Sequence, residues 1–367
     1  MQQGVKVSEI VDCLSDGTAV RQAKLEAESA RQRMKTVGAD TLQRIEFEPL
    51  QMPVNGLIVE GLTLLCGASK IGKSWLMMDL CCCVASGRPF LGRQTEAGSV
   101  LYLALEDSDR RLQQRLAALN ESQTSALQFA TSARTVNTGL LDDLRDWTEH
   151  VDEPRLIVVD TLQKVRDVTP GRANAYAEDY ALMGQLKQFA DTQHIAVVLV
   201  HHLNKMRDVS DPFERISGST GLMGAADTTI LLDRARDTQD AKLTYTGRDV
   251  YGDDICLRFA AGRWCVIGAD VLERESYAGN PLTRTVKSLL DEAFGDSVTL
   301  TAESLKEAVA QRTGTCVAGT VTRLARDVSA LAPDLQRYDG ITVERTRNGT
   351  QRGYKFLRAR KGEGNVR

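Results

Sequence analysis

The chain has 367 residues, of which 42% are hydrophobic, so it can bury at least one large core and has the length of two domains plus an extension. A formal net charge of -3 excludes the overall positive field of a nucleic-acid coat protein, and any DNA contact must come from a local patch. The eight cysteines form no C-x-x-C pair and are too sparse for a secreted disulfide scaffold. No apolar stretch reaches the length of a membrane span, and the first residues lack a signal-peptide core. We therefore expect a cytoplasmic protein with no membrane contact.

The first 50 residues are polar and carry charges of both signs. From Val20 to Lys35, Arg, Lys and Glu alternate with alanines, a pattern that favours an exposed helix. We predict an N-terminal helical arm over residues 1–50, which is either solvated or packed on a neighbouring subunit.

Residues 51–270 contain short apolar runs separated by stretches with helical character. The runs are LTLLC, SVLYLAL, RLIVVD, IAVVLV and TTILL. Runs rich in Val, Ile and Leu are typical of strands buried on both faces of a parallel sheet. We predict an α/β domain here, with a mostly parallel sheet flanked by helices.

The remaining residues indicate a second, smaller domain. Residues 271–280 are interpreted as a linker, and Pro281 can occupy the first position of a helix. The expected order then is helix 282–294, strand 298–300, helix 302–311, helix 316–331 and two strands around Gly349. This order predicts a winged helix over residues 281–358, followed by a basic flexible tail over residues 359–367.

The sequence GASKIGKS follows the first apolar run and matches the phosphate-binding P-loop (Walker A) motif at every fixed position. Backbone N–H groups of such a loop bind phosphate oxygens, Lys73 places a charge near the β and γ phosphates, and the Ser74 hydroxyl can bind Mg²⁺. The expected cofactors are ATP and Mg²⁺. The residues expected to bind the nucleotide are Gly67, Ala68, Ser69, Lys70, Ile71, Gly72, Lys73, Ser74 and Trp75.

Three other apolar runs end in residues that can take part in phosphate chemistry. Asp160 closes RLIVVD, at the edge of a parallel sheet where ligands bind, and is the expected second metal residue beside Ser74. Glu106 closes SVLYLAL and is either a base for the attacking water or a solvated acidic residue. His201 and His202 follow IAVVLV, and since neighbouring strand residues point to opposite faces, at most one of them faces phosphate.

Seven pieces of sequence between about residues 50 and 268 are together more specific than the P-loop. They are GLTLLCGASKIGKS, VASGRPFLGR, GSVLYLALED, RLIVVDTL, VLVHHLNK, SGSTGLMGAADTTILLDR and TGRDVYGDDICLRFAAGRWCVIG. In this order they resemble RecA-like ATPases of the AAA family, especially the RepA-type hexameric replicative helicases of plasmids and phages. The resemblance implies a P-loop NTPase core with a RecA-like fold, in a homo-hexamer or another homo-oligomer.

The resemblance also implies roles for single residues. Glu106 would activate water, His202 would sense the γ-phosphate, and Arg248 would be the arginine finger that reaches the nucleotide of a neighbouring subunit. Thr246 stands where relatives often carry a lysine, and Arg234 and Arg236 are alternative fingers. The implied contacts with single-stranded DNA in the ring channel are Lys205, Arg207 and Arg215.

Residues 281–367 carry 15 Lys and Arg against 10 Asp and Glu, although the whole chain is acidic. A basic wing resting on DNA phosphates would account for this asymmetry. Contact with a protein, or a solvated basic tail, would also account for it. The candidate DNA contacts are Arg323, Arg326, Arg345, Arg347 and Arg352.

The leading interpretation is an ATP-hydrolysing, DNA-dependent motor, a ring-forming helicase in replication of a plasmid, phage or mobile element. It would depend on a primase or replication initiator as a partner. The alternative is a DNA-binding regulatory or recombination ATPase that ATP switches without helicase activity. A small-molecule kinase fits less well, because Glu106 and Arg248 suit the activation of water better than a pocket for an acceptor.

Overall fold

The computed structural model describes residues 36–121, 124–167, 175–203, 213, 220–235, 238–293, 296–314, 321–348 and 351–359. The chain divides into two compact units, Met1–Leu50 and Gln51–Arg367. The expected helix over residues 20–35 lies outside the described residues. The described part of the first unit contains the short helix α2 (Ala39–Leu42), and its apolar side chains Val37, Leu42, Ile45, Phe47 and Leu50 are exposed.

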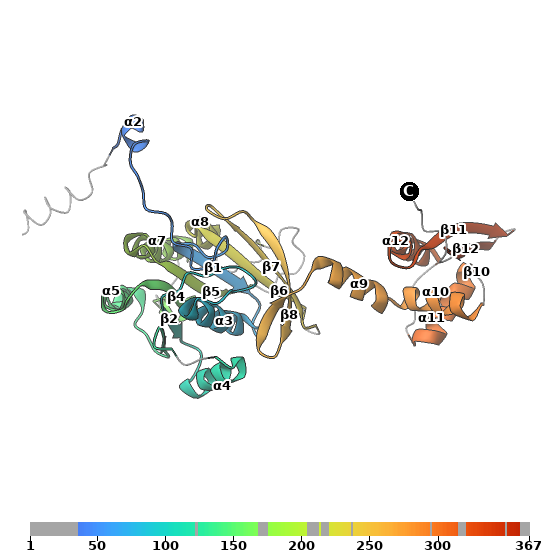
Figure 1. Cartoon of the computed structure of the whole chain (residues 1–367), viewed down its shortest axis with the longest axis horizontal. Coiled ribbons are helices and arrows are strands. Elements are labelled where there is room, and N and C mark those ends of the chain that lie inside the picture. The colour runs from blue at the N-terminus through green and yellow to red at the C-terminus, as the bar shows by residue number, and fades with distance from the viewer. Residues whose placement is uncertain are drawn as a thin grey trace, which may run out of the picture. The chain divides into compact units, whose positions relative to one another are not determined.

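The second unit contains a nine-stranded sheet in the order β3-β2-β4-β5-β1-β6-β7-β8-β9 (Figure 1). The strands from β3 to β6 in this order are parallel, and β7, β8 and β9 continue the sheet as antiparallel strands. The α/β fold with a mostly parallel sheet is therefore confirmed. The strands are β1 (Gly61–Gly67), β2 (Ser99–Ala104), β3 (Leu127–Ala130), β4 (Pro154–Asp160), β5 (Ala196–His202), β6 (Thr228–Arg234), β7 (Asp240–Gly247), β8 (Asp253–Ala260) and β9 (Arg263–Val266).

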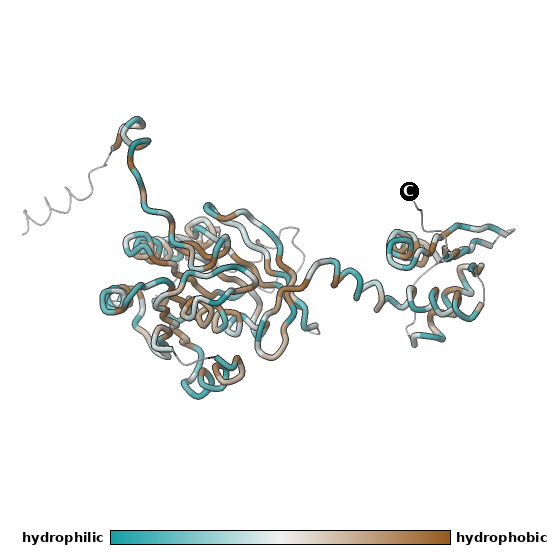
Figure 2. The backbone as a smooth tube through the Cα atoms, in the orientation of Figure 1, coloured by the Kyte–Doolittle hydropathy of each residue, from teal (hydrophilic) through white to brown (hydrophobic). Residues whose placement is uncertain are grey.

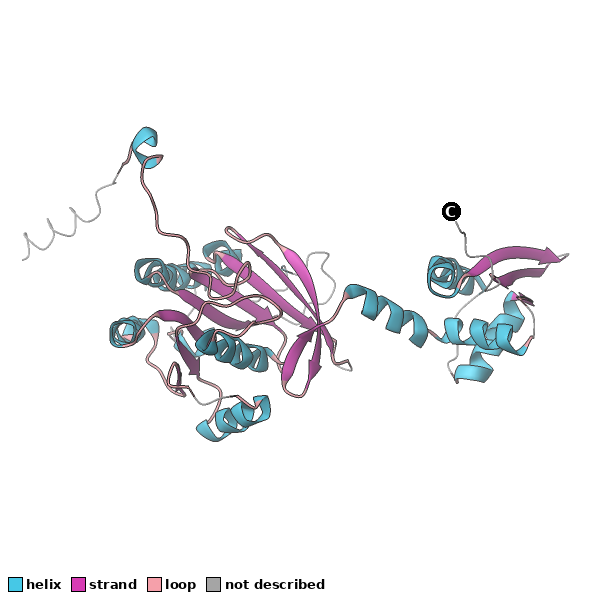
Figure 3. Cartoon of the chain, in the orientation of Figure 1, coloured by secondary structure: helices cyan, strands magenta, loops and turns pink. Residues whose placement is uncertain are grey.

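Helices cover both faces of this sheet (Figure 3). Alternate residues of each central strand enter different cores: Val158 packs with α3, and its neighbour Val159 packs with α7. This explains why the strands read as continuous apolar runs, which Figure 2 shows as hydrophobic colour along the sheet. The helices, together with the 3-10 helix η1, are α3 (Lys73–Ser86), α4 (Asp109–Leu119), η1 (Val136–Thr138), α5 (Leu140–His150), α6 (Leu162–Val165), α7 (Ala175–Gln193) and α8 (Thr220–Ala225).

The C-terminal elements form a smaller body with its own hydrophobic core. Its three-stranded antiparallel sheet has the order β10-β12-β11, and its elements follow the order expected from the sequence. The elements are α10 (Pro281–Glu292), β10 (Ser297–Thr301), α11 (Ala302–Thr313), α12 (Val321–Asp339), β11 (Ile341–Asn348) and β12 (Gln351–Arg358).

Two details of this region differ from the expectation. Most of the expected linker is helical and belongs to α9 (Ala269–Gly279), in which Tyr277 packs into the C-terminal core. Helix α12 continues past its expected end at Leu331, through Pro333, to Asp339. Leu331 and Leu335 are both buried in that core, so packing outweighs the local cost of a proline inside the helix. None of the helices in the described ranges is both long and apolar enough to cross a bilayer.

Candidate active site

The P-loop joins β1 to α3 at the edge where the parallel strands end. Gly72 has a φ of 104°, and a Cβ there would lie 2.9 Å from the Trp264 ring. A Cβ at Gly67 would lie 2.9 Å from the Leu232 carbonyl oxygen. Trp264 Nε1 also donates a 3.1 Å hydrogen bond to the Gly72 carbonyl. Gly72 is therefore required by its backbone conformation and by the close approach of β9, and Gly67 by the close approach of β6.

The Lys73 ammonium is buried within the loop. It donates hydrogen bonds of 2.8 Å to the carbonyls of Gly67 and Ala68, and it lies 3.2 Å from His202 Nδ1. Burial lowers the pKa of Lys73 to about 8, against the opposing effect of Asp160, Cys66 and Glu106. In the free protein the Lys73 ammonium is therefore bonded to neutral carbonyl oxygens. A charged phosphate oxygen is a stronger acceptor and can replace them.

Asp160 ends β4, between the ends of β2 and β5. Its carboxylate is buried, and the Tyr102 hydroxyl donates to Oδ2 at 2.9 Å. The next residue, Thr161, donates to the Val200 carbonyl at 2.9 Å. Asp160 and Ser74, the two residues expected at the metal, line the same cavity. Their oxygen atoms suit Mg²⁺, which takes few protein ligands beside substrate phosphates.

Glu106 and Asp107 follow β2 but have different surroundings. Asp107 forms ion pairs with Arg111 at 2.8 Å and with Arg115. None of the described residues forms a hydrogen bond or ion pair with the Glu106 carboxylate, although Glu106 lines the cavity. Of the two carboxylates, Glu106 is therefore the one that is available to accept a proton from water.

The two histidines at the end of β5 also differ. His201 is buried, whereas His202 lines the cavity, with Nδ1 facing Lys73 and lying 3.5 Å from Ser69 Oγ. Burial lowers the pKa of His202, and the charge of Lys73 lowers it further. Because the Lys73 ammonium can only donate, His202 accepts at Nδ1 and holds its proton on Nε2. The neutral ring can then donate through Nε2.

One cavity of about 500 Å³ is lined by the Lys73 ammonium, by the carboxylates of Glu106 and Asp160, and by His202. An aromatic wall formed by Trp75, Phe259 and Trp264 lies beside it, with ring centroids 6.0 and 5.1 Å apart. The Arg115 guanidinium lies 5.4 Å from the Trp75 ring, and that of Arg234 lies 5.5 Å from Phe259. The cavity is lined by Lys70, Gly72, Lys73, Ser74, Trp75, Glu106, Asp107, Arg111, Arg115, Asp160, His202, Arg234 and Phe259.

The sequence reasoning missed Tyr102 and Phe259, and it did not place Arg234 at this cavity. Arg234 was an alternative finger for a neighbour's nucleotide, but it lines the cavity of its own chain. Tyr102 was visible only as the one polar aromatic residue in an apolar run, and Phe259 comes from the antiparallel strand β8, far from the P-loop in sequence. No local motif connects these residues.

Arg248 lies at the opposite edge of the sheet. It follows Gly247, which pairs with Thr228 at the start of β6, and β6 runs parallel to β1. The length of β1 therefore separates Arg248 from its own P-loop, a distance of roughly 20 Å for seven residues. Arg248 cannot reach the nucleotide of its own chain.

The expected DNA contacts fall into two groups. Lys205, Arg207 and Arg215, together with the alternative finger Arg236, lie outside the described residues. The other group consists of exposed residues of α12 and of the β11–β12 hairpin. Arg345 Nη2 donates to Ser329 Oγ at 2.7 Å, which places the hairpin directly against α12. This second group is Arg323, Arg326, Arg345, Arg347 and Arg352.

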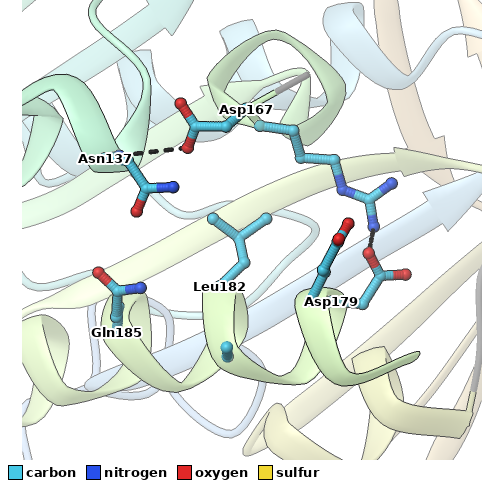
Figure 4. A pocket seen from close by; sticks show the side chains of 8 residues that line it. Asn137, Asp167, Asp179, Leu182 and Gln185 are labelled. Carbon is cyan, nitrogen blue, oxygen red and sulfur yellow. Dashed lines mark hydrogen bonds and ion pairs between the residues drawn. The ribbon is translucent and has the colours of Figure 1, made fainter. Parts of the chain in front are cut away.

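A second cavity, of about 220 Å³, lies between α7 and the segment that follows α6 (Figure 4). Arg166 forms an ion pair with Asp179 of α7, and Asp167 accepts hydrogen bonds from the Thr135 hydroxyl and the Asn137 backbone N–H. These contacts hold the chain just after the Asp160 strand against two neighbouring elements.

Comparisons with known proteins give a family match and similar solved structures. Residues 28–208 match the family model described as AAA domain. A structure described as a DnaB-like replicative helicase and its interactions with primase is similar over 71% of this chain and 75% of that chain, with 12% identity and a TM-score of 0.50. A second solved structure, described as an ATPase domain, covers 69% of this chain and 98% of its own, with 14% identity and a TM-score of 0.46. A KaiC-like protein from Pyrococcus horikoshii OT3 covers 59% of this chain and 94% of its own, with 12% identity and a TM-score of 0.43. No curated protein matches the chain.

The fold and the cavity define a P-loop site at the edge of a mostly parallel α/β sheet. Residues 28–208, just under half of the chain, are similar to the AAA domain family. At 12% identity, the similarity to the DnaB-like helicase itself shows a shared fold.

Proposed function

We propose that this protein is an ATP-hydrolysing, DNA-dependent motor that assembles as a ring, with helicase activity in replication of a plasmid, phage or other mobile element. The observation that carries the proposal is the cavity in which Lys73, Asp160 and Glu106 come together from the ends of three parallel strands. Such a constellation suits hydrolysis, because it offers a phosphate-binding cation, a metal ligand and a separate base.

The P-loop residues bind and orient ATP. Lys73 exchanges its carbonyl partners for oxygens of the β and γ phosphates, and the N–H groups at the start of α3 bind phosphate through the positive end of the helix. Ser74 and Asp160 would hold Mg²⁺, which neutralises charge on the phosphates when bound. The Tyr102 hydroxyl keeps the Asp160 carboxylate oriented.

The carboxylate of Glu106 takes the proton of the attacking water, which Asp160 cannot do while it binds metal. His202 has a neutral ring whose Nε2–H can donate to the γ-phosphate. When the phosphate leaves, His202 returns to its contact with Lys73, so the position of its side chain at the end of β5 depends on the state of the nucleotide. This is how we expect ATP turnover to be coupled to DNA.

The aromatic wall provides a site for the base of the nucleotide. The Phe259 ring and the Arg234 guanidinium are flat groups at the cavity wall, and a planar base can stack on both kinds of surface.

Hydrolysis would require a second copy of the chain, with Arg248 as the finger in trans. Arg248 lies at the sheet edge opposite its own P-loop, so its guanidinium could act only on a nucleotide bound by a neighbour. Repeated contacts between unlike edges generate a ring, and we propose a homo-hexamer. A primase or replication initiator would be a further partner.

We propose that the C-terminal body is a winged helix that binds DNA. Arg323 and Arg326 share one face of α12, and the Arg345–Ser329 hydrogen bond brings the basic hairpin next to that face. Cations spread over a helix and an adjacent hairpin can neutralise successive phosphates. This surface also supports the second candidate, an ATP-switched regulator that recognises one duplex.

The test is steady-state ATP turnover with and without single-stranded DNA, for the wild type and Glu106→Gln. We expect DNA to raise the turnover, and Glu106→Gln to lower kcat by about 10²–10⁴-fold while binding of ATP persists. Glu149→Gln, an exposed glutamate of α5, is the matched control and should behave as wild type. Turnover that ignores single-stranded DNA but responds to one duplex would favour the regulator, and normal turnover by Glu106→Gln would exclude Glu106 as the base.

A further inference from the structure

A charged cluster lies at the edge of the sheet where the parallel strands begin, and Asp227 is at its centre. The Asp227 backbone N–H donates to the Leu62 carbonyl at 2.8 Å, and its carbonyl accepts from the Arg248 N–H at 2.9 Å. Asp227 thus joins β1, the strand that leads into the P-loop, to the segment that carries Arg248.

The Asp227 carboxylate has three further donors. Lys187 of α7 donates to its two oxygens at 2.8 and 2.7 Å, and the Leu62 N–H donates to Oδ2 at 3.0 Å. The Arg248 guanidinium donates to Oδ1 at 3.3 Å. Two glycines make this arrangement possible: a Cβ at Gly61 would lie 2.7 Å from Asp227 Oδ2, and a Cβ at Gly247 would lie 2.9 Å from the Asp227 carbonyl oxygen.

The two cations are held to different degrees. The Asp227 side chain is 13% exposed and that of Lys187 is 26% exposed, whereas that of Arg248 is 60% exposed. Lys187 makes the two short bonds, and Arg248 makes the long one. If the Arg248 guanidinium leaves, Lys187 still neutralises the buried carboxylate, so the departure leaves no unpaired charge. Arg248 is therefore oriented by Asp227 without being trapped by it.

We propose that Asp227, with Lys187 as its permanent counter-ion, is a positioning residue that directs Arg248 toward the nucleotide bound to a second copy of this chain. The inference rests on the proposed function, in which Arg248 acts in trans. Asp227 itself lies roughly the length of β1 from its own P-loop, so it acts on hydrolysis only through Arg248.

A double-mutant cycle on the full-length protein tests this role. The variants are Asp227→Asn, Arg248→Ala and the double substitution, assayed for kcat, KM, affinity for a non-hydrolysable ATP analogue, and melting temperature. We expect Arg248→Ala to lower kcat by on the order of 10³-fold and Asp227→Asn by about 10-fold, with analogue affinity unchanged. The double variant should be no slower than Arg248→Ala, because Asp227 has nothing left to position.

Asp191→Asn is the matched control. It removes another carboxylate partner of Lys187, at 3.1 Å, that makes no contact with Arg248, and it should leave kcat unchanged. Losses of kcat that multiply in the double variant, or an Asp227→Asn protein with normal kcat, would overturn the inference while the proposed function stands. If Arg248→Ala turns over normally, the trans-acting arginine of the proposed function fails first.

A second cycle covers the case in which Asp227→Asn does not fold. In Lys187→Met, Arg248 is the one charged partner that Asp227 keeps among the described residues, which should hold the guanidinium in its own chain and lower kcat severalfold. The same substitution in an Arg248→Ala background should have no further effect. An equal loss in both backgrounds would mean that the cluster only supports the fold, and the inference would be wrong.

Discussion

The Lys73 side chain is buried, which disfavours its charged form. Its ammonium is hydrogen-bonded to backbone carbonyls that a phosphate can replace. In the free protein the pKa of Lys73 is lowered to about 8, and bound phosphate favours the ammonium form. Above pH 8 the free protein has lost the proton that the complex needs, so binding must take it up again. We predict that ATP affinity falls by up to about tenfold per pH unit between pH 8 and 9.5.

Calorimetric titration with an ATP analogue in buffers of different ionisation enthalpy measures this proton uptake directly. Near pH 7 the uptake by Lys73 should vanish, since the free protein is already protonated. Lys73→Arg is the control, because an arginine keeps its charge throughout this range and should remove the pH dependence. Equal affinity at pH 7 and 9.5 in the wild type would contradict the prediction.

The sequence could predict those site residues that are adjacent in the chain or end a strand. Lys73 and Ser74 belong to one motif, and Asp160 and Glu106 close apolar runs, so a parallel sheet brings them to one edge. Tyr102, Phe259 and Asp227 could not be predicted in this way. Their roles depend on which strands are neighbours, and the order β4-β5-β1-β6-β7 is a property of the folded sheet.

At the scale of elements, the pair formed by Arg166 and Asp179 connects α7 to the segment that follows the Asp160 strand. Its side chains are only 10% and 7% exposed. We predict that Asp179→Ala lowers the free energy of unfolding by about 3–5 kcal/mol, because it leaves the guanidinium buried without its partner. Urea denaturation of the full-length protein provides the measurement.

The control for this prediction is the exposed pair Arg145–Asp142, whose side chains are 47% and 73% exposed. Removing that pair with Asp142→Ala should change the free energy of unfolding by about 0–1 kcal/mol. If both variants lose a similar free energy of unfolding, burial does not determine how much the Arg166–Asp179 pair stabilises the protein.

The predicted elements of the core agree with the structure better than those of the C-terminal part. The strands of the core could be predicted from the sequence because both of their faces are buried, which gives continuous apolar runs. The end of α12 and the helical state of residues 271–279 could not be predicted. The local signals there are a proline, which indicates a helix end, and a polar stretch, which indicates a linker. Burial of Leu335 and Tyr277 in the C-terminal core, which no local signal reveals, outweighs them.

For the whole molecule, the central fact is that the sheet carries complementary groups at opposite edges. Lys73 and Glu106 lie where the parallel strands end, and Arg248 lies where they begin. An active site completed by two copies should therefore be rebuilt from two inactive variants. Lys73→Ala keeps the finger but loses the nucleotide site, and Arg248→Ala keeps the site but loses the finger.

We predict that a mixture of these two variants regains ATP turnover although each alone is inactive. In a random equal mixture, about a quarter of the interfaces pair an intact site with an intact Arg248 from the neighbour, so turnover should approach a quarter of the wild-type value. Arg248→Ala mixed with the double variant Lys73→Ala, Arg248→Ala is the control and should stay inactive, since no subunit then supplies the finger. Exchange of subunits is followed with fluorescent labels. If labelled subunits exchange and turnover does not return, Arg248 does not act across the interface, and the two edges of the sheet do not form one site.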